Sequence, residues 1–367
     1  MTQYNSHNER IKRRYFTYLK EASRYSEATV DQVSQALARF EADTGYRDFR
    51  TFQPEVAVAF KRHLAIHASA QTRRALSKAT LHSTLAHLKR FFHWLAGQPG
   101  YRARLSYSDA DYFNLTAKEA RIATARREKP FPTLEQVRHV ISSMPTANDI
   151  DQRNRALVAF TLLTGARDSA IASMKLKHID LVEGKVHQDA REVATKFSKT
   201  FTTFLFPVGD DIPQIVTDWV NHLRGHLLWG NDDPLFPATS MTVGESGGFE
   251  AAGLKRAHWT SAAPIRGIFR EAFTRAGLPY FNPHSLRNTL VQLGEQLCRT
   301  PEDFKAWSQN LGHEGVLTTF RSYGAVGNNR QGEIIRGLGQ SLPAEPLIVE
   351  QTVAAVLRRL GVTSRPG

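Results

Sequence analysis

One segment of the chain combines a histidine and an arginine with the start of a predicted helix. It reads Asn-Pro-His-Ser-Leu-Arg-Asn-Thr over residues 282–289, in which Asn282 suits a helix N-cap and Pro283 suits the first helical position. His284 and Arg287 would then share one face of the first turn, where free backbone N–H groups already favour an anion. A phosphate is a natural ligand for such a face. Taken alone, however, the segment is more simply interpreted as an ordinary surface helix.

Two further segments carry residues of the same kind. His313 follows Leu-Gly and precedes Tyr323 by ten residues, and Arg167 comes just after an apolar run that ends near Gly165. Each has a simpler interpretation, because Gly-His is common at turns and an arginine after Gly165 could cap helix carbonyls. The combination of these segments is what indicates chemistry.

In chain order, these residues resemble the active-site set of a known family. The order arginine, hairpin lysine, His-x-x-Arg, Leu-Gly-His and tyrosine resembles the tyrosine recombinases, or phage integrase family. The similarity covers a catalytic domain from about Phe131 to Gly327, and the helical bundle before it resembles the family's core-binding domain. Carried over by position, the resemblance implies six catalytic residues: Arg167, Lys196, His284, Arg287, His313 and Tyr323.

The resemblance gives each of these residues a step in DNA strand transfer. Tyr323 would attack a backbone phosphate, which the two arginines and His313 would hold. His284 would accept the tyrosine proton. Lys196 would protonate the departing 5′-oxygen, with Lys199 in the same predicted turn as a second candidate. A 5′-hydroxyl could later attack the 3′-phosphotyrosyl bond and reseal the strand.

Arginine suits this chemistry because the transition state places added negative charge on the phosphoryl oxygens. Its side chain stays protonated, and its planar fork binds two phosphate oxygens at once. Such a clamp stabilises the charge without a metal ion, and the covalent intermediate keeps the bond energy without ATP. We therefore expect no metal and no cofactor.

The chain departs from the family pattern at one position. Family members often carry a carboxylate three residues after the first arginine, where this chain has Ala170. Asp168 is close in sequence, but one position after Arg167 on a helix it would point elsewhere. Which group supports the active site at this point stays open.

The composition favours a protein that binds nucleic acid, with an anionic membrane as the second candidate partner. The chain has 367 residues, with 48 Lys and Arg against 35 Asp and Glu, and the net charge of +13 favours a polyanionic partner. No stretch approaches the roughly 20 apolar residues of a membrane span, and the N-terminus is too polar for a signal peptide. A single cysteine, Cys298, allows no internal disulfide and no thiolate zinc site. We expect a globular cytoplasmic protein that associates with the nucleoid and not with a membrane.

The N-terminal part is expected to be an all-helical bundle. Apolar residues recur at helical spacing over 78–95 and over 29–40. On the first of these helices, Lys78, Lys89 and Arg90 lie away from the apolar stripe and are candidate DNA contacts. A solvated charged face is the alternative interpretation.

A basic segment without regular apolar spacing follows, and it predicts an interdomain linker at 116–131. Its residues Arg121, Arg126 and Arg127 are further candidate DNA contacts. The predicted organisation is therefore a core-binding domain (1–115), this linker, a catalytic domain (132–340) and a C-terminal tail (341–367).

The catalytic domain is predicted to be helical with a small antiparallel sheet. After the linker, helical patterns resume, and an apolar run forms a buried helix that ends near Gly165. Short β-prone runs between residues 179 and 208, one of them at 192–197, predict the sheet. Residues 239–253, rich in Gly, Ser and Thr, predict a loop, and mostly helical patterns return from about Ala263.

The expected fold class is mainly α, with a small antiparallel β-sheet in the catalytic domain and an N-terminal helical, SAM-like core-binding domain. In the tail, apolar residues at helical spacing over 345–360 predict an amphipathic helix. This helix packs either on its own domain or on a neighbouring protomer. We expect the second arrangement to contribute to assembly.

The leading functional interpretation is a site-specific recombinase or integrase. It would act as a homo-tetramer that holds two double-stranded DNA sites, be a monomer or weak oligomer off DNA, and accept an accessory DNA-bending protein as an optional partner. One alternative is a type IB topoisomerase, which shares the phosphotyrosine chemistry but relaxes DNA at single sites. Another is a DNA-binding protein that has kept the fold and lost the chemistry.

Overall fold

The chain divides into two compact units. The computed structural model describes residues 4–66, 76–125, 130–244 and 247–313. The units comprise residues 1–126 and 127–367, and we call them the N-terminal and the C-terminal unit. The boundary between them falls within the segment predicted to be a linker.

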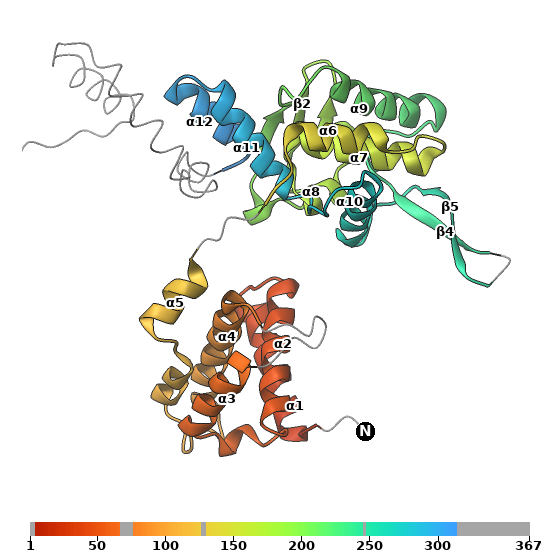
Figure 1. Ribbon diagram of the computed structural model, residues 1–367. Coiled ribbons are helices and arrows are strands. Elements are labelled where there is room, and N and C mark those ends of the chain that lie inside the picture. Colours follow the sequence, from red (N-terminus) through yellow and green to blue (C-terminus); the bar gives the residue numbers. More distant parts are fainter. Residues whose placement is uncertain (1–3, 67–75, 126–129, 245–246, 314–367) are drawn as a thin grey trace, which may run out of the picture. The chain divides into compact units, whose positions relative to one another are not determined.

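The N-terminal unit is built from helices, as predicted. α4 (Lys78–Ala96) begins where the Ser77 hydroxyl accepts a hydrogen bond from the Thr80 N–H at 3.1 Å. Its apolar stripe is buried in a core rich in phenylalanine. The other α-helices, visible in Figure 1, are α1 (Ser6–Thr17), α2 (Glu27–Asp43), α3 (Pro54–Ile66) and α5 (Ala117–Thr124), with a π-helical turn at Tyr18–Ala22 and 3₁₀ turns at Phe49–Thr51 and Tyr107–Phe113.

The predicted linker is helical in its first half. The Thr116 hydroxyl accepts a hydrogen bond from the Glu119 N–H, and the Glu119 carboxylate accepts one from the Thr116 N–H, so a capping box starts α5. α5 also contacts α4, which makes it part of the N-terminal unit. The linker prediction was wrong for this half because the helix buries only the small residue Ala123 and has no large apolar stripe.

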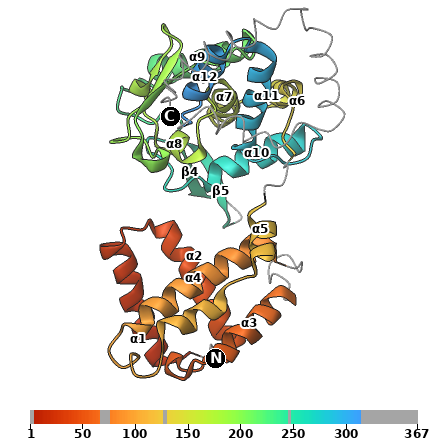
Figure 2. The ribbon, with the colours of Figure 1, turned by 90° about the vertical axis from the view of Figure 1, so that its left-hand side faces the viewer.

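The C-terminal unit contains one deeply buried helix. α7 (Asp149–Thr164) is buried from Ala156 to Thr164 and lies in the middle of the unit (Figure 2), which confirms the predicted buried helix. Around it lie α6 (Leu134–Ser143), α8 (Asp168–Ser173), α9 (Asp211–Asn221), α10 (Ala263–Arg275), α11 (Ser285–Leu297) and α12 (Pro301–Asn310), with a 3₁₀ turn at Leu176–His178 and a π-helical turn at His222–His226. None of the helices in the described ranges is long and apolar enough to cross a membrane.

The small antiparallel sheet predicted in this unit is present. Its strands β1 (Ile179–Asp180), β2 (Lys185–Gln188) and β3 (Phe201–Phe204) lie in the order β1-β2-β3, with Val186 opposite Thr203. The run at 192–197, however, is not a strand. It belongs to the connection between β2 and β3, which contains a 3₁₀ turn at Lys196–Ser198. Its apolar residue Val193 is buried in the core without a strand partner, which explains the misleading pattern.

The segment 239–253, predicted to be a loop, forms most of a β-hairpin. β4 (Ala238–Val243) pairs with β5 (Phe249–Lys255), and the hairpin projects from the unit in Figure 1. The prediction was wrong because the Gly, Ser and Thr content was taken as a sign of irregular structure. Gly253 instead adopts φ 120°, next to a register shift in the pairing, where a bulge needs a residue without a side chain.

Candidate active site

Arg287 lies where three segments of the C-terminal unit meet. It is carried by α11 and has 4% of its surface exposed. Its guanidinium donates one hydrogen bond to the Gly165 carbonyl at 2.6 Å and another to the Leu311 carbonyl at 2.5 Å. These bonds tie the ends of α7 and α12 to α11. They use two of the five guanidinium N–H groups, which leaves donors for a ligand.

Two glycines allow these segments to approach each other. Gly165 ends α7 with φ 58°, and a Cβ there would lie 3.0 Å from the Leu311 side chain. Gly312 has φ 67°, and its Cβ would lie 2.8 Å from the ring of Phe201 on β3. A side chain at either position would be strained and would also push the segments apart.

Arg167 lies close to Arg287 because it follows Gly165, which Arg287 binds, by two residues. It is the N-cap residue of α8 and is half-buried, and burial lowers its pKa. Burial, together with the positive charge of Arg167, lowers the pKa of Arg287 to about 9. Within the described ranges, no carboxylate pairs with either arginine. Two such cations repel each other, so the site favours an anion between them.

His284 is the N-cap residue of α11, a position that was predicted for Asn282. α11 begins at Ser285 with His284 as its N-cap, and the Asn282 carbonyl accepts hydrogen bonds from the Ser285 N–H (2.9 Å) and hydroxyl (2.6 Å). The N-cap prediction at Asn282 was wrong because these bonds close a separate turn that contains Pro283. His284 is exposed, yet loss of solvation and the charges of the two arginines lower its pKa.

His313 completes this side of the site from the end of α12. Its N–H donates to the Ser308 carbonyl at 3.1 Å, and its side chain is half-buried. Burial, followed by the charges of Arg287 and Arg167, lowers the pKa of His313 to about 4. The ring is therefore neutral at pH 7, and an anion at the arginines would favour its protonation.

We expect the stability of the C-terminal unit to fall on acidification because of His313. Its pKa is about 4 in the folded protein and about 6.5 in an unfolded chain, so the stabilisation is complete above about pH 6.5 and is lost as the pH falls toward 4. The loss should be on the order of 1 kcal/mol, allowing for the partial exposure of the ring. Urea unfolding at a series of pH values measures it.

A His313→Asn variant should show a flatter pH dependence, whereas replacing the exposed His139 by Asn should leave the dependence unchanged. If His313→Asn unfolds with the pH profile of the parent protein, the lowered pKa of His313 is refuted.

Both candidate lysines lie in the connection between β2 and β3. The Nζ of Lys196 is 4.7 Å from the centre of the exposed Phe197 ring. The charge of Lys196 contributes to the lowered pKa of His284, and that of Lys199 contributes to the lowered pKa of His313. Both lysines are thus close enough to influence the histidines.

The position of the missing carboxylate is part of the hydrophobic core. Ala170 is 1% exposed. Asp168 accepts a hydrogen bond from the Arg266 Nε at 2.8 Å and one from the Ser169 N–H at 2.9 Å. Asp168 is therefore bound by α10 and by its own helix, and its negative charge opposes the lowering of the His284 pKa by the two arginines.

Comparison with known proteins decides the family. Residues 131–330, more than half of the chain, match the model of the phage integrase family. The chain belongs to this family of tyrosine recombinases. The match confirms the resemblance drawn from the residue motifs, over almost the same range.

The chain is similar to curated relatives and to solved structures along most of its length. The tyrosine recombinase XerC of Xanthomonas axonopodis pv. citri (strain 306) is 25% identical over 312 residues, which cover 83% of this chain and 88% of that protein. A lambda integrase dimer bound to a COC′ core site has a TM-score of 0.59 at 13% identity, covering 86% of this chain and 95% of that one. A lambda integrase tetramer bound to a Holliday junction has a TM-score of 0.55 at 14% identity, covering 84% and 77%. These structures confirm the predicted fold class.

The structure brings most of the predicted catalytic residues together. Tyr323 lies outside the described residues, as do Arg126, Arg127 and the helix predicted at 345–360. The remaining five catalytic candidates all belong to the C-terminal unit: Arg167, Lys196, His284, Arg287 and His313. The charges of the two arginines lower the pKa of both histidines, and the charge of Lys196 lowers that of His284.

The candidate DNA contacts of the N-terminal unit differ in their surroundings. Lys78, Arg90 and Arg121 are exposed. The Lys89 ammonium instead forms an ion pair with Asp111 at 2.8 Å, so a DNA phosphate would have to compete with that carboxylate. Their role in DNA binding stays a prediction.

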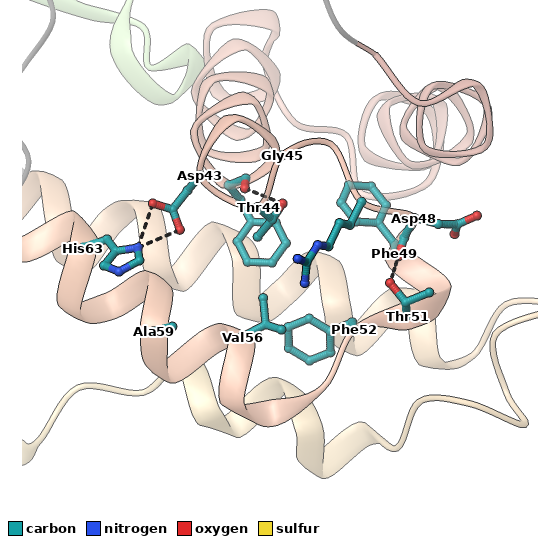
Figure 3. A pocket seen from close by; sticks show the side chains of 12 residues that line it. Asp43, Thr44, Gly45, Asp48, Phe49, Thr51, Phe52, Val56, Ala59 and His63 are labelled. Carbon is teal, nitrogen blue, oxygen red and sulfur yellow. Dashed lines mark hydrogen bonds and ion pairs between the residues drawn. The ribbon is translucent and has the colours of Figure 1, made fainter.

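A hollow of about 560 Å³ in the N-terminal unit is not part of this chemistry. Figure 3 shows Asp43 and His63 meeting at one rim, 3.1 Å apart, above the apolar side chains of Phe52 and Val56. None of the predicted catalytic or DNA-binding residues lines it.

Two serines on α8 that contact the lysine-bearing connection were not predicted. Ser169 and Ser173 both bind the backbone of Ala194. No sequence signal points to them, because their partner lies more than twenty positions away and contributes only backbone atoms.

Proposed function

We propose that this protein is a site-specific recombinase that cleaves and rejoins DNA through a 3′-phosphotyrosyl intermediate at Tyr323. It acts on double-stranded DNA at the nucleoid, in the cytoplasm. Four copies hold two DNA sites during strand exchange, and off DNA the protein is a monomer or weak oligomer. The proposal goes beyond family membership because it names the reaction and the nucleophile.

The observation that carries the proposal is the pair formed by Arg167 and the buried Arg287, which has no carboxylate partner among the described residues. Mutual repulsion makes this pair unfavourable until an anion binds. Because arginine binds phosphate oxygens in a fork geometry, the pair suits a phosphodiester. Its charge stabilises the transition state more than the ground state, since negative charge grows on the phosphoryl oxygens during the reaction.

The proposed reaction is one transesterification and its reverse. The Tyr323 oxygen forms a bond to phosphorus while the bond from phosphorus to the 5′-oxygen breaks. The phenol proton passes to His284, whose lowered pKa keeps its ring neutral and able to accept a proton at pH 7. Lys196 gives a proton to the 5′-oxygen. In resealing, a 5′-hydroxyl attacks the phosphotyrosine, and the protons return.

A covalent adduct tests the proposal. Duplexes that bind the full chain are first selected from a random-sequence pool and then nicked near the centre of the bound site, so that cleavage releases a short strand and traps the intermediate. We expect a protein–DNA adduct that survives denaturation, with the nucleotide on the peptide that contains Tyr323. If no selected duplex gives an adduct, or the nucleotide is on another residue, the proposal fails.

Recombination between two sites tests the assembly. The solved lambda integrase tetramer on a Holliday junction, which shares the fold, supports a tetramer here. A plasmid with two copies of the selected site should give recombinant products with this protein. Relaxation of a supercoiled single-site plasmid without recombination would contradict the proposal and favour a type IB topoisomerase.

We expect replacement of Lys196 to impair cleavage more than replacement of Lys199. Removing a general acid should slow cleavage of the nicked duplex by about 10²–10³-fold in Lys196→Met, whereas Lys199→Met should lose less than about tenfold. Single-turnover rates measure both, and each variant serves as the other's control because both lie on one connection. The reverse ranking would assign the proton transfer to Lys199.

A further inference from the structure

The connection between β2 and β3 is attached to α8 at a single residue, Ala194. The Ser169 hydroxyl donates a hydrogen bond to the Ala194 carbonyl at 3.2 Å. The Ala194 N–H donates to the Ser173 hydroxyl at 2.8 Å. The two serines are four positions apart and thus share one face of the helix. Together they satisfy both backbone groups of an exposed residue.

The chain turns sharply beyond this attachment. Val193, one residue before Ala194, is 2% exposed and anchors the connection in the core. Lys196 follows two residues after Ala194, and then Phe197 and Ser198 adopt φ values of 60° and 50°. Left-handed conformations at two successive residues with side chains are strained, by roughly 1 kcal/mol each. Surrounding contacts must hold such a turn in place. Backbone hydrogen bonds at Thr195 close the turn itself, and the bonds from Ala194 to the two serines attach it to α8.

The helix that holds Ala194 also positions Arg167. Arg167 is the N-cap residue of α8, and its carbonyl accepts a hydrogen bond from the Ile171 N–H at 2.9 Å. The same short helix therefore fixes the backbone of a phosphate-binding arginine at its start and the lysine-bearing turn along its side. A displacement of the turn would change the distance between the proton donor and the phosphate held by the arginines.

We propose that Ser169 and Ser173 are positioning residues that set the lysine-bearing turn, and with it the proton donor, against the phosphate site. This inference rests on the proposed function. The serines act through the Ala194 backbone and not by contact with the leaving oxygen. Their effect is therefore confined to the step in which that oxygen receives a proton.

Replacement of the leaving oxygen by sulfur distinguishes positioning of the general acid from a role in folding or in DNA binding. A thiolate leaves without a proton, so a duplex with sulfur at the bridging 5′ position does not need the general acid. We expect Ser169→Ala and Ser173→Ala each to slow cleavage of the nicked oxygen duplex by about tenfold, and the double variant by about 100-fold. On the sulfur duplex, all three should cleave within about threefold of the parent protein, as Lys196→Met should.

The controls address folding and contact with DNA. Ser143→Ala removes a hydroxyl that binds only the Val140 carbonyl of its own helix α6, and it should change neither rate. Ser173→Thr keeps the hydroxyl and should restore most of the oxygen rate. In the DNA-free protein, hydrogen–deuterium exchange at residues 189–200 should be faster in Ser173→Ala than in the parent, while exchange in α7 stays unchanged.

The outcomes distinguish the inference from the proposed function. Equal losses on the oxygen and sulfur duplexes would mean that the serines support the fold or bind DNA, and would overturn the inference while leaving the function standing. Unchanged rates on both duplexes, or unchanged exchange at residues 189–200, would overturn it as well. A parent protein that forms no adduct on either duplex would refute the proposed function, and the positioning role with it.

Discussion

A Tyr323→Phe variant should bind the selected duplex and form no covalent adduct. The change removes only the phenol oxygen, so shape and apolar contacts are kept while the atom that attacks phosphorus is lost. Because no other group attacks the phosphorus in the proposed cleavage step, we expect the rate of cleavage to fall by about 10⁴-fold or more. DNA affinity should change by less than about threefold, since the arginines that hold the phosphate are intact. Single-turnover cleavage and a binding titration on the same nicked duplex measure the two effects.

Tyr280→Phe is the matched control. Tyr280 belongs to the same unit, is 38% exposed and stacks under the guanidinium of Arg270, with its centre 5.1 Å away. Loss of its hydroxyl should leave cleavage unchanged. An adduct that persists in Tyr323→Phe, or disappears in Tyr280→Phe, would contradict the assignment of the nucleophile.

Arg287→Lys should be the most damaging conservative change in the described part of the site. Lysine keeps the positive charge but lacks the fork that reaches the carbonyls of Gly165 and Leu311 at the same time. We expect cleavage to fall by about 10²–10³-fold because the phosphate loses a preorganised donor pair. The free energy of unfolding should fall by about 1–3 kcal/mol because one buried carbonyl is left without a partner. Single-turnover cleavage and urea unfolding measure these effects.

Arg155→Lys controls for the loss of a guanidinium in the same unit. The Nε of Arg155 donates to the Ile141 carbonyl at 3.0 Å. It lies ten residues before Gly165 on α7, about 15 Å along the helix, so it is remote from the phosphate site. It should lose some stability and no activity. If Arg287→Lys keeps the parent cleavage rate, Arg287 does not hold the phosphate.

The sequence determined those features that depend on a short stretch of chain. The apolar spacing over 78–95 predicted α4, and the apolar run before Gly165 predicted the buried α7, because periodicity reports which face of a helix is covered. The motifs around Arg167, Arg287 and His313 indicated the family, because their types and order are local properties of the chain.

Local patterns failed where pairing or burial is decided elsewhere in the chain. Residues 239–243 and 249–253 form strands because these two segments pair with each other. Residues 192–197 do not form a strand, because no segment in the described part of the chain pairs with them. Neither the alternation of apolar and polar residues nor the glycine content of a segment shows whether another strand pairs with it. The start of α11 at Ser285 was likewise missed, because a turn through Asn282 satisfies the same backbone groups as the predicted cap.

The sequence by itself therefore determined the family and the candidate residues for its chemistry, while the tertiary structure decided how the described candidates are held. The bonds from Arg287 to Gly165 and Leu311, and those from Ser169 and Ser173 to Ala194, join positions more than twenty residues apart. In each of these bonds, one partner is a side chain and the other is a backbone N–H or carbonyl, a group that does not depend on the residue type. No residue type marks such a contact in the sequence, and only the packing of α7, α8 and α11 brings its two ends together.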